Sequence, residues 1–281
     1  MPPTVLVLAA VTSVQVGAAL AKTLFDELGA GGTVFVRVLS AAIVLALIWR
    51  PRLAGHSRHD LSLALAFGLV LAGMNLAFYA SLDYIPLGIA VTFEFVGPLG
   101  VAVFGSRDRL DLLWVALAAA GILLLSDFGT GGGLDGRGVA LALLAGGFWA
   151  AYILLSARVG RVFPGGQGLA LAMIVATVPL APVGIASGGE ELLVPWVLAV
   201  GAAVGVLSSA IPYTLELEAL RRMPVGVFGV LMSLEPAVAA VAGFVVLGEE
   251  LAAREIAAIL LVVAASAGAA RGAGADAPVR D

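Results

Sequence analysis

Long apolar runs, interrupted by short polar segments, cover most of this 281-residue chain. A helix that spans a membrane needs about 20 mostly apolar residues. Ten segments fit this pattern: 4–24, 33–49, 61–82, 85–104, 110–126, 138–157, 167–187, 194–217, 224–247 and 253–270. The segments between them are short and rich in Gly, Pro or charged residues, and none could form a soluble domain. The pattern therefore predicts an all-α integral membrane protein with ten transmembrane helices.

Composition strengthens this prediction. Hydrophobic residues make up 61% of the chain and charged residues 12%, whereas soluble domains carry about 25% charged residues. The absence of cysteine excludes disulfides, thiolate metal sites and cysteine nucleophiles. No basic run alternates with aromatic residues, so we expect no nucleic acid partner. The expected partners are membrane lipid and a small-molecule substrate, with the protein a monomer or homodimer.

The distribution of Lys and Arg predicts the orientation, because cytoplasmic loops are enriched in both. With ten spans, both termini lie on one side, and the loops and tail on that side hold most of the arginines: Arg50, Arg52, Arg58, Arg107, Arg109, Arg158, Arg161, Arg221, Arg222, Arg271 and Arg280. The opposite loops hold Arg137 and Arg254. Both termini are therefore expected in the cytoplasm, in a multi-pass protein of the cell (inner) membrane.

Two apolar segments of the chain repeat each other. Leu82–Gly105 and Leu220–Gly243 align without a gap at an offset of 138 residues (236 minus 98). Seven positions of the first segment are identical in the second: Leu82, Pro86, Gly88, Pro98, Ala102, Val103 and Gly105. Each copy also carries a glutamate, but Glu94 aligns with Met232 and Glu235 with Gly97.

This offset maps five expected spans onto five. Because five is odd, the two halves would cross the membrane in opposite senses, as inverted-topology repeats do. We expect a first repeat over residues 1–130, a second over 131–271, and a short cytoplasmic tail over 272–281. Such repeats usually place a substrate site at the midplane between halves, which predicts transport. The alternative is a packing relic without transport.

The repeated prolines predict a backbone defect in both halves. Pro98 has no amide hydrogen, so the carbonyl of Glu94 loses its helical partner, and Pro236 frees the carbonyl of Met232 in the same way. Exposed acceptors at equivalent depth suggest gating or ligand contact at Pro98 and Pro236. A plain kink, repaired by a hydroxyl or water, remains the alternative for each.

Charged residues inside spans are costly and by default functional. Glu94 is expected to face a wet cavity, where it binds a substrate ammonium group or takes a proton, and Glu235 is a second candidate. Arg37, placed near the outer end of the second span, could instead form a structural ion pair with Glu94. Lys22 is an ion-pair candidate near the outer end of the first span, either beside Asp26 and Glu27 or toward a substrate carboxylate.

Further polar and aromatic residues lie at depth in the expected spans: Gln15, Asn75, Tyr79, Trp149, Tyr152, Ser208, Ser209 and Tyr213. An aromatic wall with amide donors suits a zwitterionic organic solute. Hydrogen bonds between helices and interfacial aromatic belts are the alternative. We therefore add Gln15, Asn75, Tyr79, Trp149 and Tyr152 to Glu94 and Glu235 as candidate binding or coupling residues.

Other signals predict no enzyme, metal or cofactor. His56 and His59 lie in an expected cytoplasmic loop, and the expected spans contain no histidine. An integral membrane enzyme would need an ionisable cluster near one interface, and the sequence offers none. Gly184/Gly188 and Gly201/Gly205 match a close-packing motif and predict internal helix packing.

The whole chain resembles the drug/metabolite transporter superfamily in its EamA-type branch. Three segments are similar to the threonine/homoserine exporter (Rht-type) subgroup: Gly17–Phe25, Tyr84–Arg107 and Met232–Glu249. The resemblance implies export of small neutral amino acids and related metabolites by alternating access, which in the family is often, though not uniformly, taken to be driven by proton exchange. It also implies a cavity lined by the first, third, fourth, sixth, eighth and ninth spans. A transporter of another solute class, such as a drug, would share this architecture.

Overall fold

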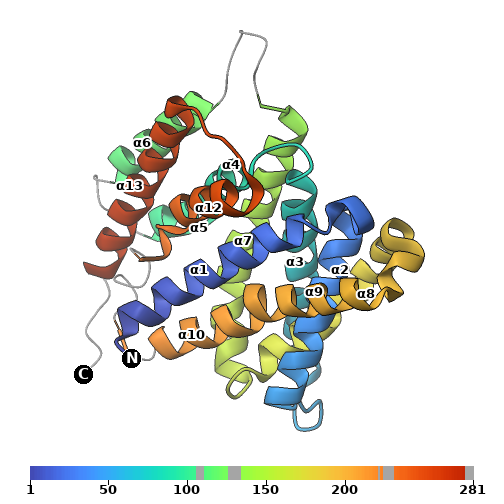
Figure 1. Cartoon of the computed structure of the whole chain (residues 1–281). Helices are drawn as coiled ribbons and strands as arrows, with labels where there is room; N and C mark the ends of the chain where they lie inside the picture. Colours follow the sequence, from blue (N-terminus) through green and yellow to red (C-terminus); the bar gives the residue numbers. More distant parts are fainter. Residues whose placement is uncertain (106–110, 126–133, 221, 224–230, 276–281) are drawn as a thin grey trace.

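The computed structural model describes residues 1–105, 111–125, 134–220, 222–223 and 231–275, and over these ranges all regular structure is helical (Figure 1). The helices in chain order are α1 (Pro3–Lys22), α2 (Phe25–Trp49), α3 (Arg58–Ser81), α4 (Leu87–Glu94), α5 (Val96–Gly105), α6 (Asp111–Leu125), α7 (Gly136–Val162), α8 (Gln167–Gly188), η1 (Gly189–Leu193), α9 (Pro195–Gly205), η2 (Val206–Ala210), α10 (Ile211–Leu220), α12 (Glu235–Ala242), η3 (Gly243–Leu247) and α13 (Ala253–Ala275). The η1 segment is a 3₁₀-helix, whereas η2 and η3 are π-helical.

Within the described ranges, 6 helical stretches are long and apolar enough to cross a membrane. They are Pro3–Lys22, Phe25–Trp49, Arg58–Ser81, Gly136–Val162, Gln167–Leu193 and Pro195–Glu216. Leu87–Val101 and Glu235–Leu247 are shorter apolar helices. The structure therefore confirms an all-helical, multi-pass membrane protein.

The second expected span begins earlier than the sequence pattern indicated. It was placed at residues 33–49, but α2 begins at Phe25 and includes a kink at Gly29, whose φ is 63°. The N-terminal part of α2 is held because Leu28 packs with Leu192 and Val197 in a buried cluster. Arg37 consequently lies about 18 Å along the helix from Phe25, at 1.5 Å per residue, and not near its end.

The repeated proline segment is a broken helix in both halves. Helix α4 ends at Glu94 and α5 begins at Val96. The second copy breaks at residues 233–234, which the 138-residue offset aligns with 95–96, and α12 then begins at Glu235. Pro98 and Pro236 thus lie in the first turn of the following helix. Amides in the first turn have no acceptor within the helix, so the missing amide hydrogen of proline costs no helical hydrogen bond there. The break comes before each proline.

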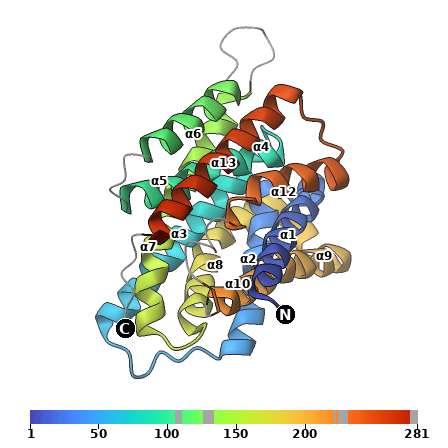
Figure 2. The ribbon, with the colours of Figure 1, turned by 90° about the vertical axis from the view of Figure 1, so that its left-hand side faces the viewer.

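Helices of one half pack against helices of the other half (Figures 1 and 2). Helix α2 contacts α8, α4 contacts α12, and α6 contacts α13, while α1 contacts α10 and α3 contacts α7. One close crossing needs glycine on both sides. Gly97 abuts the carbonyl oxygen of Gly146, and a Cβ atom on Gly146 would lie 2.6 Å from the carbonyl oxygen of Glu94. The α4–α5 break therefore sits directly against α7.

The glycine motifs are used for packing inside the chain, as expected. Gly184 of α8 lies against Phe35 of α2, and Gly201 of α9 lies against Val36. A Cβ atom on Gly205 would lie 2.8 Å from the backbone oxygen of Arg37. Helices α8 and α9 therefore approach α2 closely and fix the position of Arg37.

Candidate functional site

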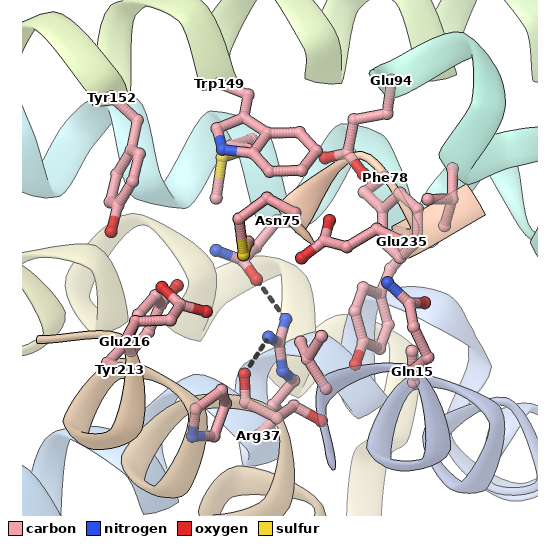
Figure 3. A pocket seen from close by; sticks show the side chains of 18 residues that line it. Gln15, Arg37, Asn75, Phe78, Glu94, Trp149, Tyr152, Tyr213, Glu216 and Glu235 are labelled. Carbon is pink, nitrogen blue, oxygen red and sulfur yellow. Dashed lines mark hydrogen bonds between the residues drawn. The ribbon is translucent and has the colours of Figure 1, made fainter. Parts of the chain in front are cut away.

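A cavity of about 120 Å³ lies among α1, α2, α3, α4, α7, the η2–α10 segment and α12 (Figure 3). Its polar and aromatic lining residues are Gln15, Arg37, Asn75, Phe78, Tyr79, Glu94, Trp149, Tyr152, Ser208, Tyr213, Glu216 and Glu235. Since a water molecule needs about 10–15 Å³ of such space, the cavity can hold several waters or a small solute.

The structure brings seven sequence-predicted residues into this one lining: Gln15, Asn75, Tyr79, Glu94, Trp149, Tyr152 and Glu235. They come from five helices, α1, α3, α4, α7 and α12. Pro98, Pro236 and Lys22 do not line the cavity. The two prolines lie just beyond the helix breaks, and Lys22 lies at the end of α1.

Arg37 lines the cavity but does not form the ion pair with Glu94 that the sequence pattern allowed as an alternative. Its side chain is buried, with 7% of its surface exposed. The guanidinium donates a hydrogen bond to Oδ1 of Asn75 and a second, 3.1 Å long, to the backbone oxygen of Ser208. Its central carbon lies 5.2 Å from the ring centre of Tyr79. Because Arg37 lies in the middle of α2, neutral acceptors of α3 and η2 are nearer to it than Glu94 is.

The backbone oxygen of Ser208 can accept the hydrogen bond from Arg37 because a proline lies four residues later. In an α-helix the amide four residues later would bond to this carbonyl, but position 212 is Pro212 and has no amide hydrogen. The chain forms a π-helical turn here, from Val206 to Ala210. The adjacent carbonyl of Leu207 accepts a 2.7 Å hydrogen bond from Ser13. Backbone acceptors freed by the irregular turn are thus used by side chains of α1 and α2.

Three carboxylates share the cavity with Arg37. Glu94 ends α4, Glu235 begins α12, and Glu216 lies on α10 (Figure 3). Glu94 and Glu235 are 8% and 4% exposed. Within the described residues, none of the three is held by a hydrogen bond or a salt bridge. The carboxylates are therefore available to a solute or a proton.

Sequence reasoning missed Glu216, although the internal repeat contained a signal for it. The offset of 138 residues maps the lining pairs Met74/Pro212, Asn75/Tyr213 and Phe78/Glu216 onto one another. Val14/Tyr152 and Glu94/Met232 correspond in the same way. The two halves thus present equivalent helix faces to one cavity. Glu216 lies three residues after Tyr213, the offset partner of the candidate Asn75, so extending that equivalence by one helical turn would have included Glu216.

Aromatic side chains form one wall of the cavity. Trp149 meets Phe95 edge to face at 5.2 Å between ring centres, and Tyr152 stacks on Phe67 at 5.2 Å. Tyr152 also lies 6.4 Å from Tyr213. Across the part of the chain that the structure describes, no three His, Cys, Asp or Glu residues converge to hold a metal ion.

Lys22 pairs with a partner that the sequence did not suggest. Its Nζ atom lies 2.7 Å from Oε1 of Glu249, and not beside Asp26 or Glu27. The second oxygen of Glu249 accepts a 2.9 Å hydrogen bond from the backbone amide of Leu87, the first residue of α4. Gly243 leaves room for this carboxylate, because a Cβ atom there would collide with it.

An apolar all-helical chain whose two similar halves enclose one polar cavity is a membrane transporter by architecture. Comparison with known proteins agrees. The chain belongs to the EamA-like transporter family, and the sequence model of that family matches residues 136–271. The chain is 43% identical over 270 residues to proteins named "Threonine/homoserine exporter RhtA" from Salmonella typhimurium (strain SL1344) and Escherichia coli (strain K12). Each alignment covers 95% of this chain and 90% of the relative.

More distant similarities agree with the fold. The "Uncharacterized transporter YxxF" of Bacillus subtilis (strain 168) is 25% identical over 226 residues, covering 74% of this chain and 70% of that protein. A protein of known crystal structure superposes with a TM-score of 0.59 at 19% identity, over 94% of this chain and 96% of its own. The named relatives are transporters and not enzymes, which confirms the expectation of transport.

Proposed function

We propose that this protein exports small neutral amino acids, such as threonine and homoserine, from the cytoplasm across the inner membrane. The observation that carries the proposal is the 43% identity to threonine/homoserine exporters along 95% of the chain. The cavity supports it, because carboxylates, a guanidinium, amides and aromatic rings line a space suited to a small zwitterion.

The proposed mechanism is alternating access between two inverted five-helix repeats, residues 1–130 and 131–271, with both termini and the tail 272–281 in the cytoplasm. Ten crossings follow if each broken helix pair, such as α4 with α5, spans the membrane once. The packing of α2 on α8, α4 on α12 and α6 on α13 supports a two-fold relation between the repeats. Breaks before Pro98 and Pro236 would then serve as the gating hinges.

The proposed site consists of the seven sequence-predicted lining residues together with Arg37 and Glu216. Glu94 is the proposed coupling residue, because it ends a broken helix, is buried, and has no partner among the described residues. If it carries the proton, Glu94→Gln will remove the response of transport to a pH gradient, whatever its effect on substrate affinity. A gradient response equal to that of the unmodified protein would refute this role.

The proposed function is tested by counterflow in proteoliposomes. Radiolabelled threonine should accumulate in vesicles preloaded with threonine or homoserine, and other small neutral amino acids should compete. Drug-like organic cations are the matched competitors, because three carboxylates against one arginine could also suit a cation. Counterflow of such cations, with no effect of any amino acid, would overturn the proposal.

A further inference from the structure

Arg37 is a buried cation whose protein contacts leave binding capacity unused. A guanidinium has five N–H donors, and those of Arg37 meet two neutral acceptors, the amide oxygen of Asn75 and the backbone oxygen of Ser208. Its Nε atom is buried without a hydrogen-bond partner, and among the described residues no carboxylate lies within ion-pair distance. Burying a charge without an ionic partner is costly, so a carboxylate would find a strong anchor here.

The neighbours of Arg37 hold the guanidinium without neutralising it. Asn75 is itself fixed, since its side-chain nitrogen donates a 2.8 Å hydrogen bond to the carbonyl of Leu71. The Ser208 carbonyl is held by the π-helical turn, and the ring of Tyr79 lies against the guanidinium. These three residues act as positioning groups for a cation in the cavity wall.

Arg37 and two of the three cavity carboxylates lie on different sides of the cavity. In Figure 3, Arg37 enters from the lower side, Glu94 enters from the upper side, and Glu235 lies between them at the right, while Glu216 lies at the lower left. A solute with a carboxylate at one end and an ammonium group at the other would match this arrangement. Arginine suits the first end because its planar guanidinium binds carboxylates through two parallel hydrogen bonds.

We propose that Arg37 binds the α-carboxylate of the transported amino acid, while the acidic side formed by Glu94 and Glu235 receives its α-ammonium group. This inference rests on the proposed function and assigns the substrate's orientation. It makes Arg37 the residue that selects amino acids over amines. The sequence pattern also allowed a structural ion pair between Arg37 and Glu94, and the proposal gives Arg37 a role in binding substrate instead.

The test compares two ligands in the purified full-length protein: threonine, and the amino alcohol that carries a hydroxymethyl group in place of its carboxylate. In Arg37→Gln, the affinity for threonine should fall roughly ten- to hundredfold, the size of a lost charge-assisted contact. The affinity for the amino alcohol should change less than about threefold. Arg158→Gln is the matched control, because Arg158 is an exposed arginine on α7 outside the cavity lining.

A second variant keeps the arginine and decides the case if Arg37→Gln does not fold. Asn75→Asp places a resident carboxylate where Arg37 now has a neutral oxygen, so it should compete with the substrate carboxylate. Threonine affinity should fall while amino-alcohol affinity holds or rises. Equal losses for both ligands, or unchanged threonine affinity, would overturn the inference. Failure of the unmodified protein to bind any amino acid would instead overturn the proposed function.

Discussion

Lys22 and Glu249 form an ion pair with 2.7 Å between Nζ and Oε1, joining the end of α1 to the residue that follows η3 and Gly248. The two side chains are 23% and 14% exposed. Because the other oxygen of Glu249 accepts the amide of Leu87, one carboxylate ties three elements from both halves of the chain.

This geometry predicts unequal effects of removing the two partners. Lys22→Ala removes one contact and should lower stability by about 1 kcal/mol, whereas Glu249→Ala removes both and should cost about 2–3 kcal/mol. Thermal unfolding in detergent measures the difference, with Glu250→Ala as the control because Glu250 is exposed. Equal shifts for the two variants would show that the bond to Leu87 contributes nothing.

Alternating access predicts that this contact must open. The chain has no cysteine, so Lys22→Cys combined with Glu249→Cys supplies a unique thiol pair. Cross-linking the pair should reduce threonine counterflow by more than about tenfold, and reduction should restore it. Leu8→Cys with Thr12→Cys is the control, since both residues lie on α1. Full transport by the cross-linked protein would mean that these elements never separate.

The crossing of α7 with the α4–α5 break predicts opposite effects at adjacent glycines. A Cβ atom on Gly146 would lie 2.6 Å from the carbonyl oxygen of Glu94, so Gly146→Ala should destabilise by roughly 1–3 kcal/mol. Gly147 has nothing within 4 Å of such an atom, and Gly147→Ala should stabilise by up to about 1 kcal/mol through helix propensity. The two melting temperatures, measured side by side, provide the check; a neutral Gly146→Ala would argue against the close crossing.

Pro212 is predicted to matter for transport more than for stability. Pro212→Ala supplies an amide that can bond to the Ser208 carbonyl and compete with Arg37. Stability should hold or rise, while threonine counterflow should fall roughly tenfold, as expected for about 1.4 kcal/mol of lost positioning. Pro179→Ala is the control, because Pro179 is an exposed proline within α8. Undiminished counterflow in Pro212→Ala would show that the π-helical turn does not contribute to substrate binding.

Much of the cavity lining could be predicted from the sequence, because polar residues in apolar spans face either the bundle interior or a water-filled cavity. The depth of Gln15, Glu94 and Trp149 in the expected helices predicts a shared polar site, and the structure places all three on one cavity. The break near Pro98 followed from the missing amide hydrogen. The position of the break, before Pro98 and not at it, could not be predicted, because the proline is accommodated in the first turn of α5.

The partners of charged residues could not be predicted, because they depend on tertiary contacts between distant segments. Glu249 lies 227 residues from Lys22 in sequence, and no local pattern connects them. The sequence pattern puts Arg37 too close to the end of its helix for a different reason. The glycine-rich start of α2 does not read as a continuous apolar run, although burial of Leu28 keeps it helical.

Cavity positions that are equivalent in the two halves carry unlike side chains: Asn75 corresponds to Tyr213, and Phe78 corresponds to Glu216. Two identical five-helix chains related by a two-fold axis would have to present the same group twice around that axis. Such a pair could offer a head-to-tail molecule on the axis no preferred direction. A single chain with two diverged halves escapes this restriction, and it can bind a molecule with two different ends in one orientation.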